Sequence, residues 1–264
     1  MRMTSLKLAE PSVELSFWNL GRLLSAGIRR EVPWFDPHLH GAGYWCWKPF
    51  IMLRELESLQ EGDYLLYTDA GRPPGTLFRH SVQPLVQWLE EKGQDILPGV
   101  NISYYTGDLS RWCKQSVFDA LNLDIRDFEH SPLIQPTPCF LKKSEESVRI
   151  LREWMELCRQ FSLVSSPTPE EKSRCRDNFA DHTHDQTLWS LVAAMNHLDC
   201  LYSGKGVIHL DGRHPFLRHP GFDDKDPDFF LGELGAERVE RPLLTFLSGV
   251  HHAIAFCEKA VNKS

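Results

Sequence analysis

An acidic residue at the end of an apolar strand is the first candidate for chemistry in this chain of 264 residues. Asp69 follows the run DYLLYT, where a short apolar stretch between turn residues predicts a buried strand. Ligands of open α/β sheets bind at the carboxyl ends of strands, and the small Gly71 leaves space beside the carboxylate. Asp69 can therefore hold a metal ion or a sugar hydroxyl. The simpler alternative is that it caps a loop.

The sequence HTHDQ supplies the second group of candidates, at the predicted start of a helix. The carboxylate of Asp185 and the amide of Gln186 can hydrogen-bond sugar hydroxyls, and His184 stands beside them. Asp185 can also stabilise a developing positive charge or orient an acceptor. In the alternative interpretation Asp181 or Thr183 caps the helix and the histidines are solvated.

The sequence VIHLDGRHPF supplies the third group. His209 ends an apolar strand, and neutral imidazole is a good ligand for divalent metals. Gly212 would let the backbone approach a diphosphate closely, and Arg213 and His214 can contact phosphate oxygens. The alternative is a histidine that only caps its strand.

Strands that alternate with helices must position these three groups. Apolar patterning predicts strands near 13–18, 63–69, 100–105, 134–143 and 206–212. Helices are predicted at 19–30, 50–60, 81–93, 110–122, 144–161 and 182–197, and residues 242–261 are also helix-like. Ser144 is the expected N-cap of its helix. Alternation of this kind predicts a largely parallel sheet.

Composition excludes several classes of protein. The chain is 42% hydrophobic and 25% charged, as globular domains are, and its net charge of −7 argues against binding nucleic acid. No segment approaches the roughly 18 apolar residues that span a membrane, and the start of the chain lacks the apolar core of a signal peptide. Seven scattered cysteines without a CxxC pair predict reduced thiols and a cytoplasmic protein.

The order of these motifs resembles that of nucleotide-sugar glycosyltransferases with the GT-A fold, most closely the glycogenin-like retaining group. Those enzymes carry Asp-x-Asp, a later Asp-Gln and a final His-x-x-Gly-x-x-Lys. The segments GYWCWKP, YTDAG and HTHDQ resemble a bacterial branch of such enzymes that serves polysaccharide biosynthesis. The resemblance covers roughly residues 40–215.

The resemblance implies a GT-A-like (Rossmann-like) α/β fold, with a mostly parallel sheet flanked by helices. Residues 1–220 would form the catalytic domain, and residues 221–264 an acidic loop and a C-terminal helical extension packed on it or on a second copy in a homo-oligomer. The implied activity is that of a hexosyltransferase. It would move a sugar from a nucleoside diphosphate, with UDP as the first candidate, to a hydroxyl of a glycan or glycolipid. Such an enzyme would work in the cytoplasm, free or peripherally at the inner membrane face.

Roles for individual residues follow from the same resemblance. Asp69 and His209 match the ligands of a divalent metal, Mn²⁺ or Mg²⁺. Asp185 and Gln186 match the pair that faces the sugar and the acceptor. Residues of the donor pocket would be Trp47, Lys48, Asp69, Gly71, His184, Gly212 and Arg213. Core packing is the alternative for Trp45 and Trp47.

Two departures from the family pattern keep other functions open. Gly71 stands where the second Asp of Asp-x-Asp is expected, and the final Lys is absent unless Arg213 or His214 replaces it. One alternative is therefore a catalytically degenerate domain that binds a glycan or a partner protein. The other is a metal-dependent hydrolase that uses the histidine-rich loops at 38–40, 182–185 and 209–214. The second is disfavoured because HTHDQ opens a helix instead of ending an early strand.

Overall fold

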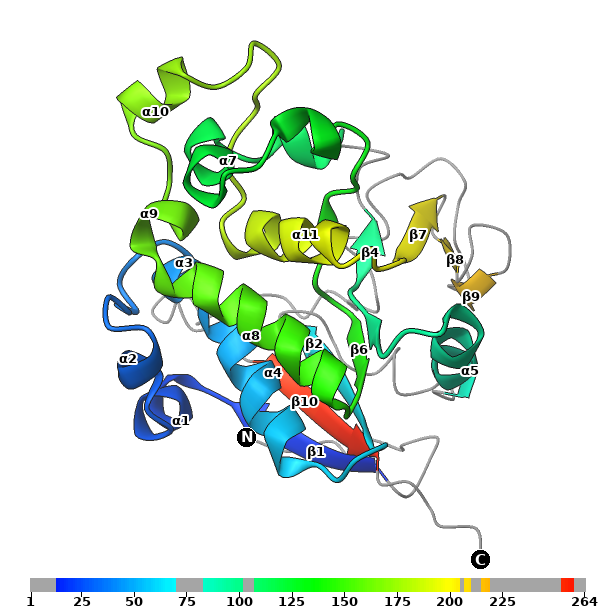
Figure 1. The fold of residues 1–264 in the computed structure, drawn as a ribbon. Helices are drawn as coiled ribbons and strands as arrows, with labels where there is room; N and C mark the ends of the chain where they lie inside the picture. The colour runs from blue at the N-terminus through cyan, green and yellow to red at the C-terminus, as the bar shows by residue number, and fades with distance from the viewer. Residues whose placement is uncertain are drawn as a thin grey trace, which may run out of the picture.

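The fold is mixed α/β, as predicted, with two sheets and helices that cover them (Figure 1). It is seen in a computed structural model that describes residues 13–69, 83–101, 107–204, 207–209, 215–218 and 253–258. The helices are α1 (Leu20–Ser25), α2 (Ile28–Glu31), α3 (Gly41–Tyr44), α4 (Trp47–Ser58), α5 (Gln83–Lys92), α7 (Gln115–Leu121), α8 (Glu145–Arg159), α9 (Phe161–Val164), α10 (Pro169–Ser173) and α11 (Asp185–Met195), with 3-10 turns η2 (Leu109–Arg111) and η3 (Ile125–Phe128). The strands are β1 (Val13–Trp18), β2 (Tyr64–Asp69), β3 (Ile96–Leu97), β4 (Val100–Asn101), β5 (Ile134–Gln135), β6 (Cys139–Lys142), β7 (Leu201–Gly204), β8 (Val207–His209), β9 (Pro215–Arg218) and β10 (Ala253–Glu258).

The prediction of a mostly parallel sheet is wrong. The first sheet has the order β1-β10-β2-β6-β3, and each neighbouring pair in it is antiparallel. The second sheet has the order β5-β4-β7-β8-β9, in which the described pair β4–β7 is parallel and the others are antiparallel. The finer expectation of a Rossmann-like sheet is thus not met by the described strands.

The reason lies in two strands from later in the chain. Strands β1 and β2 are both antiparallel to β10, and β2 and β3 are both antiparallel to β6, so β1, β2 and β3 all run in the same direction. The helices between these three strands therefore act as the crossovers that the alternating pattern predicts. However, β10 lies between β1 and β2, and β6 lies between β2 and β3, each in the opposite direction. Local patterns do not reveal such insertions.

The predicted C-terminal helical extension is contradicted where the structure describes it. Residues Ala253–Glu258 form β10, which pairs with β1 on one side and with β2 on the other. Ala253 lies opposite both Trp18 and Asp69, so this strand supports the end of β2 that carries the candidate carboxylate. The error has a simple cause: a short apolar run such as AIAFC has no period that separates a buried strand from a buried helix.

Helices α4, α8 and α11 form the layer that carries the site. Helix α4 contacts β2 and β10, α8 packs on α4, and α11 packs on α8 (Figure 1). The amphipathic pattern of α8 and its N-cap Ser144 are confirmed, since the Ser144 hydroxyl accepts the N–H of Ser147 in a capping box. The rings of Trp154 and Trp189 pack 4.5 Å apart in the core between α8 and α11. Helices α4, α8 and α11 are therefore joined by a packed core.

Two smaller expectations concern the thiols and the membrane. The six cysteines whose side chains the structure describes are free, and five of them are buried; they are Cys46, Cys113, Cys139, Cys158, Cys175 and Cys200. None of the helices that the structure describes combines the length and the apolar character needed to cross a bilayer.

Candidate functional site

A cavity of about 360 Å³ brings several of the sequence candidates together. It opens between the start of α4, the carboxyl end of β2, the segment after β5 and the start of α11. Its lining residues are His40, Trp45, Lys48, Asp69, Gln135, Pro136, Asp181, His182, Thr183, His184, Asp185 and Gln186. Lys48, Asp69, His184, Asp185 and Gln186 were all candidates from the sequence, and they converge from three separate segments.

The centre of this cavity is an ion triad, in which one ammonium group faces two carboxylates. The Nζ atom of Lys48 lies 3.5 Å from Oδ2 of Asp69 and 3.4 Å from Oδ2 of Asp185. The side chains of Lys48 and Asp185 are only 8% and 3% exposed, whereas that of Asp69 is 25% exposed. Since buried charges persist only when paired, both carboxylates depend on the ammonium of Lys48.

Each member of the triad is fixed by a different element. Lys48 belongs to the first turn of α4, and Asp185 is the first residue of α11, where the helix dipole favours a carboxylate. Asp69 ends β2, where its Oδ1 accepts a 2.7 Å hydrogen bond from the hydroxyl of Tyr67 and its backbone N–H donates to Oγ1 of Thr137. Tyr67 was missed from the sequence, although the period of two along a strand places residues 67 and 69 on one face.

Burial and charge move the ionisation of the triad in opposite directions. Burial alone would lower the pKa of Lys48, but Asp185 and Asp69 outweigh it and raise that pKa above its ordinary value. Burial raises the pKa of Asp185 to about 6; Lys48 opposes this rise and the charge of Asp69 adds to it. Two carboxylates in one pocket thus have different environments, and such pairs commonly divide acid and base roles.

Buried polar atoms without a hydrogen bond gather in the HTHDQ segment. In the part of the chain that the structure describes there are four such side-chain atoms: Nδ1 and Nε2 of His182, Nε2 of Gln186, and Oδ2 of Asp185, which is ion-paired with Lys48 at 3.4 Å. All belong to residues that line the cavity. An unpaired buried polar group costs about 1–3 kcal/mol, so several in one place call for a functional reason. Together they offer both acceptors and an amide donor.

The wall of the cavity contains a strained backbone. All five residues from 41 to 45 have positive φ angles, so α3 and the following residue form a left-handed turn. Its hydrogen bonds run from the N–H of Tyr44 to the carbonyl of His40 (2.6 Å) and from that of Trp45 to Gly41 (3.2 Å). Glycine adopts this conformation freely, but Ala42, Tyr44 and Trp45 each lose about 1–2 kcal/mol in it. Strain of this kind concentrates at functional sites.

Replacing Gly41 by Ala tests whether the left-handed turn shapes the cavity. A Cβ atom on Gly41 would lie 2.4 Å from the indole ring of Trp45, so we expect this ring to leave the cavity wall. The matched control is Gly93→Ala, because Gly93 has a similar φ (64° against 58°) but open space around it. Chemical unfolding should show a loss of about 1 kcal/mol for the control and about 2–4 kcal/mol for Gly41→Ala. Equal losses would mean that the Trp45 contact carries no energy.

The structure places Trp47 away from the cavity, in contrast to the donor-pocket prediction. Its side chain is 2% exposed in the core, and its Nε1–H donates to the carbonyl of Gly41. The neighbouring Trp45 lines the cavity instead. The two tryptophans differ because the backbone conformation changes at Cys46. Trp45 belongs to the left-handed turn, whereas Trp47 is the first residue of α4 and faces the core. Gln135 is a further lining residue that no sequence motif had indicated, and His40, from the histidine-rich loop at 38–40, also lines the cavity.

The structure describes only part of the predicted metal site and donor pocket. Gly71, Gly212 and Arg213 lie outside the described residues, and His209 is described only as the last backbone position of β8, in the second sheet. Within the described ranges no three His, Cys, Asp or Glu side chains gather to hold a metal ion. The position between Asp69 and Asp185, which a divalent cation would share, is taken by the ammonium of Lys48. At this position the described residues therefore form an ion triad and not a metal centre.

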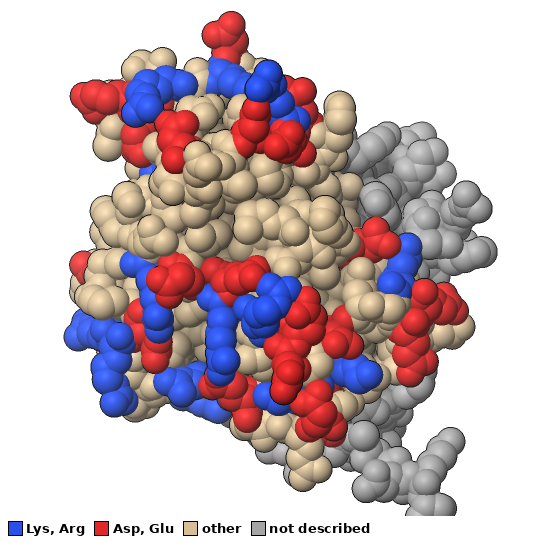
Figure 2. All heavy atoms as spheres, in the orientation of Figure 1, with Lys and Arg blue, Asp and Glu red and all other residues tan. Residues whose placement is uncertain are grey.

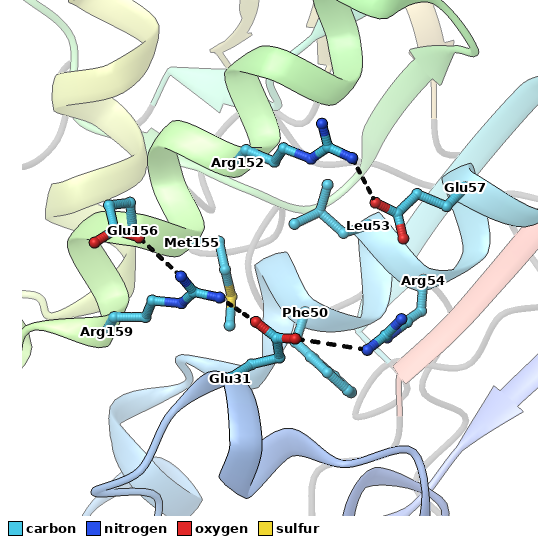
Figure 3. Close-up of a pocket in the computed structure, with 9 residues that line it drawn as sticks. All are labelled: Glu31, Phe50, Leu53, Arg54, Glu57, Arg152, Met155, Glu156 and Arg159. Atoms are coloured by element: carbon cyan, nitrogen blue, oxygen red, sulfur yellow. Dashed lines mark hydrogen bonds and ion pairs between the residues drawn. The ribbon is translucent and has the colours of Figure 1, made fainter.

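A second hollow lies between α2, α4 and α8 (Figure 3). It has an apolar floor of Phe50, Leu53 and Met155 and a volume of about 340 Å³. Its charged rim is internally paired: Arg54 with Glu31, Arg152 with Glu57, and Arg159 with both Glu31 and Glu156. Because its arginines already have carboxylate partners, this hollow is better explained as a surface ion-pair network than as a binding site.

Comparison of this chain with protein-family models, with curated proteins and with solved structures finds no match. Its function is therefore argued from the residues of the cavity.

Proposed function

We propose that this chain is a glycosyltransferase that moves a sugar from a nucleoside diphosphate donor, in the first place a UDP-sugar, to a hydroxyl of a glycan or glycolipid. The observation that carries the proposal is the set of buried polar atoms at the ion triad that lack a hydrogen bond. A sugar presents many hydroxyls, each of which both donates and accepts, and such a ligand would satisfy the acceptors of His182 and Asp185 and the donor of Gln186 together. The order of the sequence motifs supports the same choice.

The triad gives each residue a separate task. Asp185, held by Lys48 and facing the cavity, would accept the proton of the attacking hydroxyl or stabilise the positive charge that develops on the sugar. The bond from the anomeric carbon to the phosphate oxygen breaks with its electron pair on the leaving diphosphate, while the acceptor oxygen forms the new bond. Gln186 and His182 would hold sugar hydroxyls. Lys48 would keep Asp185 ionised and Asp69 in place.

Release of the nucleotide tests the proposal directly. Purified protein is incubated with individual UDP-, GDP-, ADP- and TDP-sugars, with and without Mn²⁺, and free nucleoside diphosphate is measured. We expect release from at least one donor, lost in Asp185→Asn but kept in Asp119→Asn, which changes an exposed carboxylate of α7. The arm with Mn²⁺ also tests the cofactor prediction. No release from any donor, together with no thermal shift by UDP, would remove the enzyme proposal.

A degenerate binding domain remains the competing function, because Gly71 replaces a carboxylate of the family motif. The two functions differ in one measurable respect. A binding domain would show a thermal shift with a sugar nucleotide or glycan and no turnover, whereas a transferase shows both.

A further inference from the structure

Residues with positive φ angles converge on one contact beside the cavity. Six residues other than glycine have such angles in the described ranges. Asn122 caps the C-terminus of α7, and His197 follows the end of α11, where left-handed residues are ordinary. The other four are Ala42, Tyr44 and Trp45 of the left-handed turn and His184 at the start of α11. The last three meet ring to ring.

These rings continue outward as a connected series. The ring of His184 lies 6.0 Å from that of Trp45 and 4.7 Å from that of Tyr44. The ring of Tyr44 lies 6.0 Å from that of Phe161, the first residue of α9, whose side chain is 45% exposed. We call Trp45, His184, Tyr44 and Phe161 the aromatic track. It begins in the lining of the cavity and ends at the surface.

The track is uncharged. Burial lowers the pKa of His184, so its imidazole is neutral at neutral pH. Its Nδ1 also pairs with the carbonyl of Val164, which fixes the ring against α9. Figure 2 shows a broad belt without charged side chains at the level of α9 and α11, between a charged lobe over α7 and α10 and a charged region over α4 and α8. The outer end of the track at α9 therefore lies in a neutral surface.

We infer that the aromatic track is the binding site for an oligosaccharide acceptor, whose sugar rings stack along it and whose reacting hydroxyl enters the cavity. This inference rests on the proposed function and names its acceptor. Pyranose rings have flat C–H faces that pack on aromatic rings and hydroxyl edges that need polar partners. Phe161, Tyr44 and Trp45 offer rings that are at least partly exposed, the last two with polar phenol and indole edges, and the buried ring of His184 supports them. The track leads to the atoms of His182 and Gln186 that lack a hydrogen bond.

The backbone strain has a reason under this inference. The left-handed turn places the rings of Tyr44 and Trp45 where both contact the ring of His184. The strained backbone fixes the positions of these two rings before the ligand binds, and preorganised sites bind more tightly.

Binding of sugar chains without any donor provides the test. Cellohexaose, maltohexaose and chitohexaose, with the corresponding disaccharides, are titrated against the protein, and tryptophan fluorescence and calorimetry report binding. Phe161→Ala removes the outer ring of the track. Phe17→Ala is its matched control, since Phe17 is 44% exposed and lies on β1, which is not part of the track. Phosphatidylcholine vesicles are the comparison ligand.

We expect at least one hexasaccharide to bind more tightly than its disaccharide, and Phe161→Ala to weaken that hexasaccharide about tenfold. Phe17→Ala should bind it as the wild type does. The inference is overturned if no chain binds, if affinity does not depend on chain length, if both variants behave alike, or if only vesicles bind. Nucleotide release is measured separately on the wild type with donor alone. If no sugar chain binds but nucleotide is released, the inference fails and the proposed function stands. If a sugar chain binds but no donor is turned over, the proposed function fails and the track is still a binding site for sugar chains.

Discussion

Lys48→Met is expected to lower the free energy of unfolding by about 3–5 kcal/mol, the usual cost of removing one partner from a buried ion pair. Without the ammonium, the carboxylates of Asp69 and Asp185 face each other across a space that excludes most water. Asp185 would then have lost the group that opposes its high pKa, and would take up a proton at neutral pH. Transfer activity should disappear with the ionised carboxylate.

The measurement is urea unfolding followed by tryptophan fluorescence at pH 7. Lys92→Met is the matched control, because Lys92 also pairs with an aspartate, Asp199 at 2.7 Å, but on the surface of the protein. A surface pair of this kind contributes about 0–1 kcal/mol. A loss for Lys48→Met no larger than that for Lys92→Met would show that the triad does not stabilise the fold.

The double variant Lys48→Met with Asp185→Asn keeps the prediction testable if the single variant fails to fold. It removes one positive and one negative group, so one carboxylate remains, and that carboxylate, Asp69, is partly exposed and bonded to Tyr67. We expect the double variant to regain most of the lost stability. If it is as unstable as Lys48→Met, packing of the lysine stem is responsible and the charge is not.

Local features were predictable because their causes are local. The alternating apolar residues of 13–18, the cap at Ser144 and the run before Asp69 each lie within a few residues of the element that they specify. Asp69 and Asp185 were found for the same reason, since each stands at an expected strand or helix end, whereas Lys48 was indicated by the family resemblance. Their types and positions therefore indicated a polar ligand before any contact between them was known.

The contacts themselves were not predictable, because they depend on long-range pairing. Insertion of β6 and β10 between the earlier strands decides the order of the sheet, and no motif in either strand names its neighbours. The ammonium between two carboxylates joins α4, β2 and α11, which lie far apart in the sequence. The left-handed turn runs against the local preference of Ala42, Tyr44 and Trp45, so only tertiary packing maintains it.

Asp185→Asn is expected to separate stability from activity. The pKa of Asp185 is about 6 in the fold, above its ordinary value of 3.8. Between these two values the folded protein holds a proton that the unfolded chain has released, so ionisation of Asp185 weakens the fold as the pH rises through this window. The shift of roughly two units corresponds to about 3 kcal/mol. The neutral Asn avoids this loss, and Lys48 keeps Asp69 as its partner.

The variant should therefore be more stable than the wild type at pH 8, by up to about 3 kcal/mol, and no more stable than the wild type at pH 4, where Asp185 is protonated. Urea unfolding at the two pH values measures this difference.

Transfer by Asp185→Asn should fall at least about a hundredfold, the usual contribution of a general base. Wild-type activity should decline as the pH falls through 6. Asp119→Asn, on the surface of α7, should change neither property. If the variant instead loses stability at pH 8, the ionised carboxylate stabilises the fold. Asp185 would then be a structural partner of Lys48, and its charge would not be kept at a cost in stability for catalysis.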